Sequence, residues 1–336
     1  MPIAQLIPNK TYFFFSHTIK EQPYNRDLLR AVLDKNIKLI DYEALTDERG
    51  KRLIAFGRFA GMVGAHNGIL VYGRRTGKYT LGRMKDYLDY ADAKLVYQQL
   101  RLPPMKVVLT GSGRVGQGAA AVLKDMGLRR ASPEEFLNQD FTEAVFTQLD
   151  CIDYAARKDG HAFSKRDFYQ HPERYKSIFG PYFQAADVMI NGIYWDKKAP
   201  AFFTKEDMRR KDFNLQVIAD VTCDIAPLSS IPSTLRASTI EDPVYGYDPQ
   251  TERETAPYQP RAIDVMAIDN LPNELPRDSS KAFGRQFITY ILPELLKEQS
   301  PMLERATIAE HGKLGPHFQY LEGYVRGEEV REEMKG

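Results

Sequence analysis

Residues 106–116 read KVVLTGSGRVG, and an alanine-rich stretch, 117–126, follows them directly. The first five residues favour a buried strand, and the glycines form the pattern GxGxxG where a helix would begin. In this context Gly111 permits a tight turn, Gly113 lets the backbone approach a pyrophosphate, and Gly116 allows the helix to pack closely on the strand. The stretch predicts a dinucleotide-binding unit with the helix N-terminus facing the anion, the alternative being a turn of small residues without a ligand.

Apolar runs on both sides of this stretch predict further strands and helices. The run 11–16, the helical spacing of apolar residues in 23–35 and the second run 37–40 predict a strand, a helix and a strand. The Gly/Ala-rich stretch 57–72 fits a closely packed helix, and 81–100 a long amphipathic helix that connects two domains. Farther along, we expect strands at 188–193, 215–219 and 264–268, an inserted segment at 154–182, and a helix at 283–296 that is kinked at Pro293.

These elements predict an α/β fold of two Rossmann-like, doubly wound lobes. Residues 1–100, with 280–336 returning to them, are expected to form a substrate or catalytic lobe, and residues 101–279 the dinucleotide-binding domain. Ligands of such sheets bind at the carboxyl ends of the strands. Residues 220–224 and Asp269, which follow predicted strands, are therefore placed where chemistry occurs.

The composition excludes several classes of partner. Forty-six Lys and Arg residues balance 45 Asp and Glu residues among 336, so the net charge of +1 gives no basic face for nucleic acid or anionic membranes. No apolar run reaches the ~18 residues of a membrane span. Only two cysteines, Cys151 and Cys223, are present, and neither they nor the histidines have the spacing of a metal site. We expect a cytoplasmic protein with a small-molecule substrate and no metal, and its oligomeric state stays open.

The acidic residue that usually holds the ribose of NAD is missing from its expected place. It normally follows the second strand, ~20 residues after the first glycine. Residues 128–132 read LRRAS there and contain no carboxylate. Arg130, together with Arg129 and Ser132, could instead accept a 2′-phosphate, which makes NADP a candidate beside NAD. The alternative is a solvated pair of arginines.

Five separated segments resemble the saccharopine dehydrogenase and lysine–2-oxoglutarate reductase family, whose fold is related to that of alanine dehydrogenase. They are 15–22 (FSHTIKEQ), 39–43 (LIDYE), 50–57 (GKRLIAFG), 219–224 (ADVTCD) and 268–278 (IDNLPNELPRD), in the family's order. The resemblance implies a nicotinamide cofactor. It also implies reduction of an imine formed between an amino acid and a 2-oxo acid, or oxidation of the resulting secondary amine.

The resemblance also implies roles for individual residues. His17 matches a catalytic acid/base histidine, and Lys20 and Glu43 match charged positions that influence its proton transfer. On the substrate side stand Gln22, Arg52, Phe56, Thr222, Cys223 and Asp224, with Arg52 suited to clamp a carboxylate. On the cofactor side stand Lys51, where the family tends to have arginine, and Gly111, Gly113, Arg114, Val115, Gly116, Tyr194, Val221, Ile268, Asp269, Asn270 and Leu271.

The chain also departs from the family. Family members begin with a further segment that carries a catalytic lysine and a substrate-binding arginine, and we find no counterpart of either in this sequence. We therefore expect the first lobe to be incomplete at its N-terminus, with a sheet edge exposed beside 11–16. Three functions stay open: a saccharopine dehydrogenase-like enzyme, a simpler amino-acid dehydrogenase such as one acting on alanine, and an NAD(P)-binding protein without catalysis.

Overall fold

The computed structural model describes residues 2–328, and its chain divides into two compact units. Unit 1 consists of residues 1–55 and 280–336, and unit 2 of residues 56–279. The boundary lies at residue 56 rather than near residue 100, because the helix after it packs on the sheet of unit 2. The long helix expected at 81–100 is also shorter, since the Asp89 side chain accepts a hydrogen bond from the Asp92 amide and caps a new helix there.

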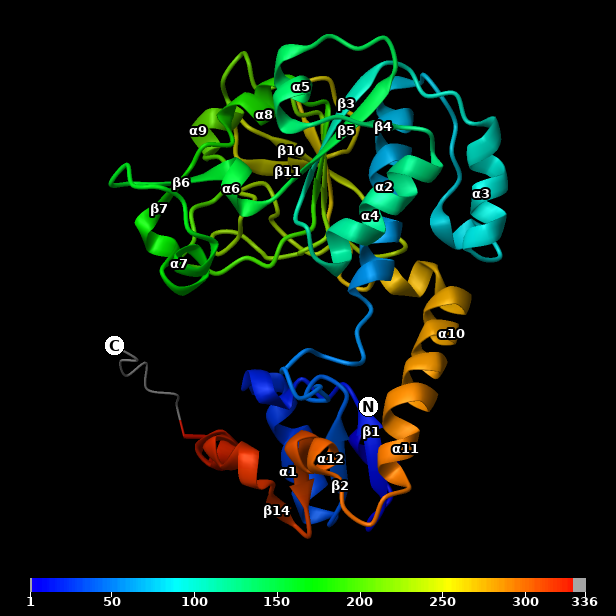
Figure 1. Cartoon of the computed structure of the whole chain (residues 1–336), viewed down its shortest axis with the longest axis vertical. Helices are drawn as coiled ribbons and strands as arrows, with labels where there is room; N and C mark the ends of the chain where they lie inside the picture. Colours follow the sequence, from blue (N-terminus) through cyan, green and yellow to red (C-terminus); the bar gives the residue numbers. More distant parts are fainter. Residues whose placement is uncertain (1, 329–336) are drawn as a thin grey trace. The chain divides into compact units, whose positions relative to one another are not determined.

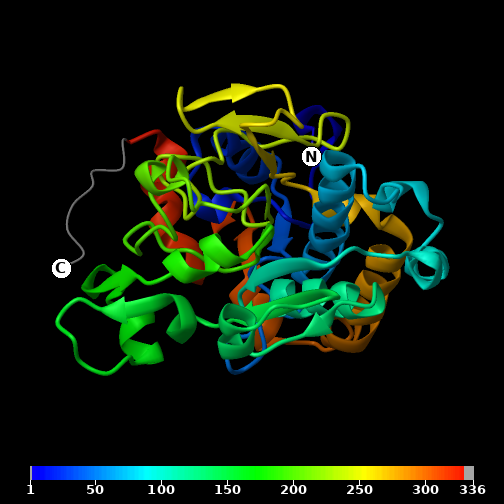
Figure 2. The same ribbon diagram turned by 90° about the horizontal axis from the view of Figure 1, so that it is seen from above.

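Unit 2 is built on an eight-stranded sheet with the order β11-β10-β12-β9-β8-β3-β5-β4. The six strands from β12 to β4 run parallel, and β10 and β11 add an antiparallel hairpin at one edge, yellow in Figure 2. The strands are β3 (Met105–Thr110), β4 (Arg129–Arg130), β5 (Ala144–Leu149), β8 (Val188–Asn191), β9 (Val217–Asp220), β10 (Tyr245–Asp248), β11 (Arg253–Thr255) and β12 (Ile263–Met266). This parallel sheet confirms the predicted Rossmann-like fold.

Helices cover both faces of this sheet (Figure 1). Val107 of β3 faces a core with α2 (Gly57–Thr76) and α4 (Arg114–Asp125), and its neighbour Val108 faces the opposite core. The second core is covered by α5 (Pro133–Asn138), α8 (Gly180–Ala185) and α9 (Lys205–Met208), while η4 (Met84–Asp86), α3 (Tyr90–Gln99) and η6 (Leu271–Glu274) pack on the α2 side. Because the side chains of successive strand residues point to opposite faces of the sheet, helices pack on both faces and unit 2 has three layers.

A separate small sheet interrupts the chain between β5 and β8. Its two strands are β6 (Ala155–Arg157) and β7 (Tyr175–Ser177), and the helices α6 (Cys151–Tyr154), α7 (Lys165–Gln170) and η5 (Pro172–Arg174) lie before and between them in the chain. A cluster of four buried residues, Cys151, Ala155, Phe168 and Tyr175, forms its own core. We call residues 150–178 the inserted segment, and it corresponds to the insertion that the charged and aromatic sequence predicted.

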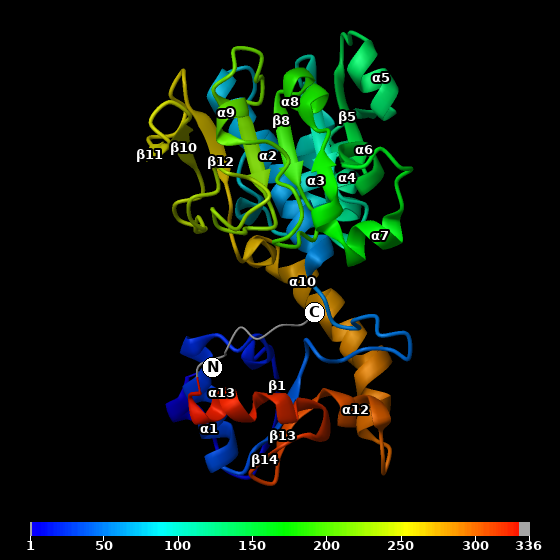
Figure 3. The ribbon, with the colours of Figure 1, turned by 90° about the vertical axis from the view of Figure 1, so that its left-hand side faces the viewer.

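Unit 1 contains a four-stranded sheet with the order β1-β2-β13-β14. The predicted strand, helix and strand are β1 (Thr11–Phe14), α1 (Arg26–Asp34) and β2 (Lys38–Asp41), and β1 and β2 are parallel. The sequence prediction missed the antiparallel hairpin β13 (Thr307–Glu310) and β14 (Lys313–Leu314). The short helices η1 (Ile3–Gln5), η2 (Thr18–Lys20), η3 (Pro23–Asn25), α12 (Pro301–Ala306), η8 (Pro316–Leu321) and α13 (Glu322–Arg326) complete the unit, and α13 packs beside α1 (Figure 3).

The helix expected at 283–296 is longer and has a wider turn. It begins as α10 (Pro276–Gln286), continues as a π-helical segment, η7 (Phe287–Ile291), and ends as α11 (Leu292–Leu295). Pro293 has no amide hydrogen and its ring crowds the preceding turn, so the turn before it opens to i→i+5 bonding. None of the helices between residues 2 and 328 combines the length and the apolar character that crossing a bilayer requires.

Candidate functional site

Three basic residues of unit 1 converge on the carboxylate of Glu43. Glu43 Oε2 lies 3.2 Å from His17 Nδ1, and Glu43 Oε1 lies 3.6 Å from Lys20 Nζ and 2.5 Å from Arg52 Nη2. Only 11% of the Glu43 side chain is exposed, whereas the three bases are 39–48% exposed. Burial alone would raise the pKa of Glu43, but the hydrogen bond from Arg52 and the charge of Lys20 lower it below its ordinary value. Glu43 is therefore ionised, and its carboxylate holds the three basic side chains close to one another.

The backbone around the end of β2 positions this cluster. The buried Asp41 carboxylate accepts hydrogen bonds from the Ser16 amide at 2.9 Å and from the Glu43 amide at 2.7 Å, so it ties the end of β1 to the end of β2. Burial raises the pKa of Asp41 despite these donors. His17 follows Ser16 with a φ of 55°, a left-handed conformation that turns the chain into η2. Two adjacent strand ends thus present His17 and Glu43 to each other.

The other predicted residues of this region lie around the cluster or outside unit 1. The backbone carbonyl of Gln22 accepts a hydrogen bond from Tyr324 at 2.6 Å. Lys51 is exposed, and its amide is bound by Asp47 at the tight turn. Phe56 is the N-cap residue of α2 and belongs to unit 2. The structure thus brings together His17, Lys20, Glu43 and Arg52.

The glycine loop of unit 2 has the geometry of a pyrophosphate cradle. Gly111 adopts a φ of 98°, which favours glycine, and its amide donates to Leu149 at 2.9 Å. A Cβ on Gly116 would lie 2.0 Å from the Gly111 oxygen, so only glycine fits there. A Cβ on Gly113, the N-cap of α4, would meet no atom within 4 Å. The space on the Cβ side of Gly113, at the N-terminus of α4, is therefore open, and a helix N-terminus is favourable for an anion.

The structure supplies an acidic residue that counting along the sequence missed. On the side of β3 away from β8, the neighbouring strand is β5 and not β4, and Asp150 follows the last residue of β5. Asp150 Oδ2 accepts a hydrogen bond from Ser112 of the glycine loop at 3.1 Å and lies 2.6 Å from Lys165 Nζ. Burial alone would raise the pKa of Asp150, but Lys165 and the Cys151 amide outweigh it and lower the value to about 2. An ionised carboxylate thus stands beside the loop, 39 residues after Gly111.

The residues predicted to accept a 2′-phosphate make other contacts in the structure. Arg129 pairs with Glu143 at 2.7 Å, and the Ser132 hydroxyl caps α5. Arg130 is exposed and stands level with Phe146 of β5, three residues before Leu149. At ~3.3 Å per residue, its backbone is ~10 Å short of the carboxyl edge of the sheet.

A buried polar network closes the carboxyl end of β9. The Asp220 carboxylate accepts hydrogen bonds from Thr222 at 2.5 Å, Thr234 at 2.7 Å and Asn191 at 2.9 Å. Burial raises the pKa of Asp220. Burial, and then the charge of Asp220, raise the pKa of Asp224 to about 6. The carboxyl of Asp224 therefore loses its proton at a higher pH than an ordinary aspartate does.

Cys223 is held as a structural thiol. Its φ is 55°, and its Sγ donates to the Ala267 carbonyl at 3.0 Å. Burial, and then the charge of Asp220, raise the pKa of the thiol to about 12. Cys223 is therefore protonated at neutral pH and is no nucleophile.

The remaining residues assigned to the cofactor side differ in exposure. Ile268 and Leu271 are buried in the core, so their side chains support the edge, whereas Asp269 and Asn270 are exposed. Val221 packs so tightly on α2 that a Cβ on Gly64 would lie 2.3 Å from it. Val115, which follows Arg114 in α4, lies against Gly57 and Gly192. Tyr194 is 87% exposed.

Several known enzymes are similar to this chain in sequence. No model of a protein family matches the chain. The α-aminoadipic semialdehyde synthase of Bos taurus, a mitochondrial protein, is 29% identical over 96% of this chain, and that of Arabidopsis thaliana is 29% identical over 95%. The saccharopine dehydrogenase [NAD(+), L-lysine-forming] of Neurospora crassa is 27% identical over 87% of this chain. This chain is a homologue of these enzymes.

The extent of these matches differs. The chain spans 40% of the length of the Bos taurus protein and 34% of the Arabidopsis thaliana protein, but the match covers 70% of the Neurospora crassa enzyme. Among solved structures, an L-alanine dehydrogenase matches with a TM-score of 0.58 and 13% identity, over 95% of this chain and 76% of that one. A transhydrogenase from Sinorhizobium meliloti matches with a TM-score of 0.50, 9% identity and coverages of 93% and 77%. The predicted resemblance and the α/β fold are thus confirmed.

Among residues 2–328, no three His, Cys, Asp or Glu side chains gather in a way that could hold a metal ion.

Proposed function

We propose that the chain is a nicotinamide-dependent oxidoreductase acting on the C–N bond that joins lysine and 2-oxoglutarate in saccharopine. The observation that carries this proposal is the cradle of the glycine loop in a chain homologous to saccharopine dehydrogenases. The dinucleotide, when bound, supplies or accepts a hydride. The amides at the start of α4 hold its pyrophosphate, and Gly113 leaves the room for it.

Unit 1 carries the proton-transfer and carboxylate-binding groups of this proposal. His17 transfers the proton of the reacting nitrogen, and Glu43, 3.2 Å from its Nδ1, fixes the orientation of the ring. Arg52 binds a carboxylate of the substrate, because a guanidinium matches a carboxylate with two parallel hydrogen bonds. Its bond to Glu43 holds the guanidinium in place, so Glu43 positions both groups. Lys20 adds positive charge for an anionic substrate.

At the carboxyl edge of unit 2, Asp224 binds the amino group of the substrate. Its pKa of about 6 leaves the carboxylate ionised at neutral pH, where it attracts an ammonium group. Thr222 and Cys223 set the backbone that presents Asp224, because both are fixed by hydrogen bonds at 2.5 Å and 3.0 Å.

For the cofactor, we propose NAD rather than NADP. Asp150 is ionised beside the glycine loop, where a carboxylate accepts the two ribose hydroxyls and repels a 2′-phosphate. Lys165 favours a phosphate, but its ammonium is already paired with Asp150 at 2.6 Å. Asp150→Asn should weaken NADH binding by about tenfold or more, since a charge-assisted bond contributes ~1.5–3 kcal/mol. A chain that binds NADPH more tightly than NADH, unchanged by Asp150→Asn, contradicts this choice.

An assay of the purified chain tests the activity. We expect NADH oxidation with lysine plus 2-oxoglutarate and NAD reduction with saccharopine, but little turnover with ammonia plus pyruvate. His17→Ala should abolish turnover and keep NADH affinity, and Lys313→Ala, an exposed residue of β14, serves as the control. Turnover only with ammonia plus pyruvate would favour an alanine dehydrogenase-like enzyme. NADH binding without turnover on either pair would favour a cofactor-binding protein without catalysis.

The cytoplasmic location expected from the cysteine content stays a prediction. Cys151 and Cys223 are both free thiols, which fits a reducing compartment. Three relatives, including the Bos taurus protein, are mitochondrial by name.

A further inference from the structure

We propose that a groove at the amino edge of the sheet of unit 2 binds a small organic phosphate, a molecule that joins a phosphate group to an apolar part. The groove is lined by residues that precede β9 and β12, by the end of α2 and by the residues after α9. Neither the glycine loop nor the Glu43 cluster uses any of these residues. The inference therefore goes beyond the proposed function and does not depend on it.

The groove lies at the opposite edge of the sheet from the glycine loop. Leu215 and Gln216 directly precede β9, and Arg261 and Ala262 directly precede β12. The two strands are parallel neighbours, so these residues meet at the amino edge, whereas the glycine loop follows the carboxyl end of β3. At ~3.3 Å per residue, the four residues of β9 separate the two edges by ~13 Å. A ligand in the groove is therefore separate from a dinucleotide at the glycine loop.

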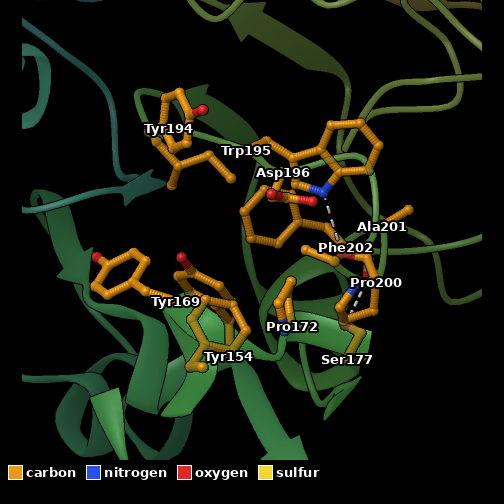
Figure 4. Close-up of a pocket in the computed structure, with 13 residues that line it drawn as sticks. Tyr154, Tyr169, Pro172, Ser177, Tyr194, Trp195, Asp196, Pro200, Ala201 and Phe202 are labelled. Carbon is orange, nitrogen blue, oxygen red and sulfur yellow. Dashed lines mark hydrogen bonds between the residues drawn. The ribbon is translucent and has the colours of Figure 1, made fainter. Parts of the chain in front are cut away.

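Two cavities of unit 2 differ in the room that they offer. The aromatic pocket beside the inserted segment is nearly filled by the rings of Tyr154, Trp195 and Phe202 (Figure 4), and its volume of ≈ 50 Å³ holds only a few water molecules. The groove at the amino edge has a volume of ≈ 340 Å³, which is within the range of about 300–1,000 Å³ of small-ligand sites. The groove therefore has room for a small organic molecule, and the aromatic pocket does not.

The charge of the groove is positive. Of the described residues that line it, four are arginines and none is Asp or Glu. The arginines are Arg75 near the end of α2, Arg209 and Arg210 after α9, and Arg261 before β12. This set is one-sided in a chain whose 46 Lys and Arg residues balance 45 Asp and Glu residues. A phosphate group carries about two negative charges and three acceptor oxygens, and guanidinium groups bind it with parallel hydrogen bonds.

Carboxylates outside the lining hold three of these arginines in place. The pairs are Arg75 with Asp264, Arg209 with Glu252, and Arg210 with Asp212. A guanidinium has five N–H donors, so each of the three keeps donors for a ligand. Arg261 is exposed, and among residues 2–328 it makes no ion pair. The groove therefore combines three oriented guanidiniums with one whose charge is not balanced by a contacting carboxylate.

Apolar side chains also line the groove. Met208, Leu215 and Ile263 are almost fully buried, and Phe213 is half-buried. The ring of Phe213 stacks on that of Phe183 with their centroids 4.9 Å apart, which fixes its orientation. An inorganic anion would leave these side chains without a contact, so an anion with an apolar part fits the groove better.

Titration calorimetry of the full chain tests the inference with phenyl phosphate as the probe. Low ionic strength is needed, because salt screens exposed charges. Phenyl phosphate should bind more tightly than inorganic phosphate, which has no apolar part, and more tightly than benzoate, which carries a single charge. Saturation with NADH should leave the affinity for phenyl phosphate unchanged, since the two sites lie at opposite edges of the sheet.

Variants of exposed arginines locate the probe. Arg261→Gln should weaken the binding of phenyl phosphate about fivefold, because it removes the positive charge that makes no ion pair in the described part of the chain. Arg261→Lys keeps the charge and should weaken it by less than about twofold. Arg166→Gln, which removes an exposed arginine of α7 outside the groove, is the matched control and should change nothing. Unaltered melting temperatures of the variants show that they fold.

Several results would overturn the inference. Phenyl phosphate that does not bind the unchanged chain, or that binds no more tightly than inorganic phosphate or benzoate, contradicts a groove built for an organic phosphate. Equal affinities of the unchanged chain and Arg261→Gln place the probe outside the groove, as do equal losses in Arg166→Gln and Arg261→Gln. Competition by NADH places it at the glycine loop. None of these results decides the turnover assay, so the inference and the proposed function fail separately.

Discussion

Two glycines of the loop should respond oppositely to the same substitution, because one faces packed backbone and the other faces open space. A Cβ on Gly116 would lie 2.0 Å from the Gly111 carbonyl oxygen and 2.7 Å from its carbon, and these are backbone atoms that do not rotate away. A Cβ on Gly113 would meet nothing within 4 Å, and its φ of −76° suits any residue. Alanine at these positions therefore separates folding from cofactor binding.

For Gly116→Ala, we expect a loss of about 3 kcal/mol in the free energy of unfolding, the upper part of the range for overpacking, because the contact must open by about 1 Å. For a unit of this size that loss lowers the melting temperature by about 6–12 °C. Gly113→Ala should melt within about 2 °C of the unchanged protein but bind NADH at least about tenfold more weakly, since the methyl group takes the place of the pyrophosphate.

Calorimetric melting and NADH titration of the full chain measure both effects. Gly180→Ala, where a Cβ also meets nothing within 4 Å, is the control, and it should change neither quantity. The reasoning is refuted if Gly113→Ala melts as low as Gly116→Ala, or if it binds NADH as tightly as the unchanged protein.

Three further predictions concern unit 2. The pKa of Asp224 is about 6 in the folded chain and ~3.9 in the unfolded chain, so the native state binds more protons between these values. The free energy of unfolding therefore falls as the pH rises from about 4 to 6. Asp224→Asn should remove up to ~2 kcal/mol of this fall, which urea unfolding at several pH values measures. Arg83→Met should cost about 3–5 kcal/mol in urea unfolding, because it leaves the buried Glu274 carboxylate without its ion pair, and Arg83→Met with Glu274→Met should recover most of the loss. Cys223 should react with iodoacetamide far more slowly in the native chain than in urea at pH 8, since its thiol pKa is about 12; equal rates would contradict the raised pKa of this thiol.

The sequence predicted what depends on local pattern. The run of apolar residues before Gly111 and the glycine spacing predicted β3, the tight turn and α4, because each needs only neighbouring residues. The Gly/Ala content of 57–72 predicted the close packing of α2, which the contact between Gly61 and Val115 shows. The predicted His17 and Glu43 also meet, although 26 residues separate them, because they follow adjacent parallel strands.

Features that depend on the order of the strands in the sheet were not predicted from the sequence. Counting about 20 residues from Gly111 leads to β4, but β4 pairs outside β5, so the strand beside β3 on this side is β5, which is followed by Asp150. Two-residue strands such as β4 and β14 have too few residues to show a period. The domain boundary was also misplaced, since an amphipathic pattern shows that a helix is buried on one side but not which sheet buries it.

Helix α2 carries a consequence for the synthesis of this chain. Its residues 61–73 are all buried, so it has almost no polar face, and it packs on β8 and β9. The ribosome completes β9 roughly 140 residues after the end of α2, which at about 5–20 residues per second takes about 7–30 s. For that interval an apolar helix exists without the full set of strands that cover it, because β8 is also completed only near the end of the wait. The yield of folded protein should therefore depend on the speed of translation and on chaperones that shield α2 during this wait.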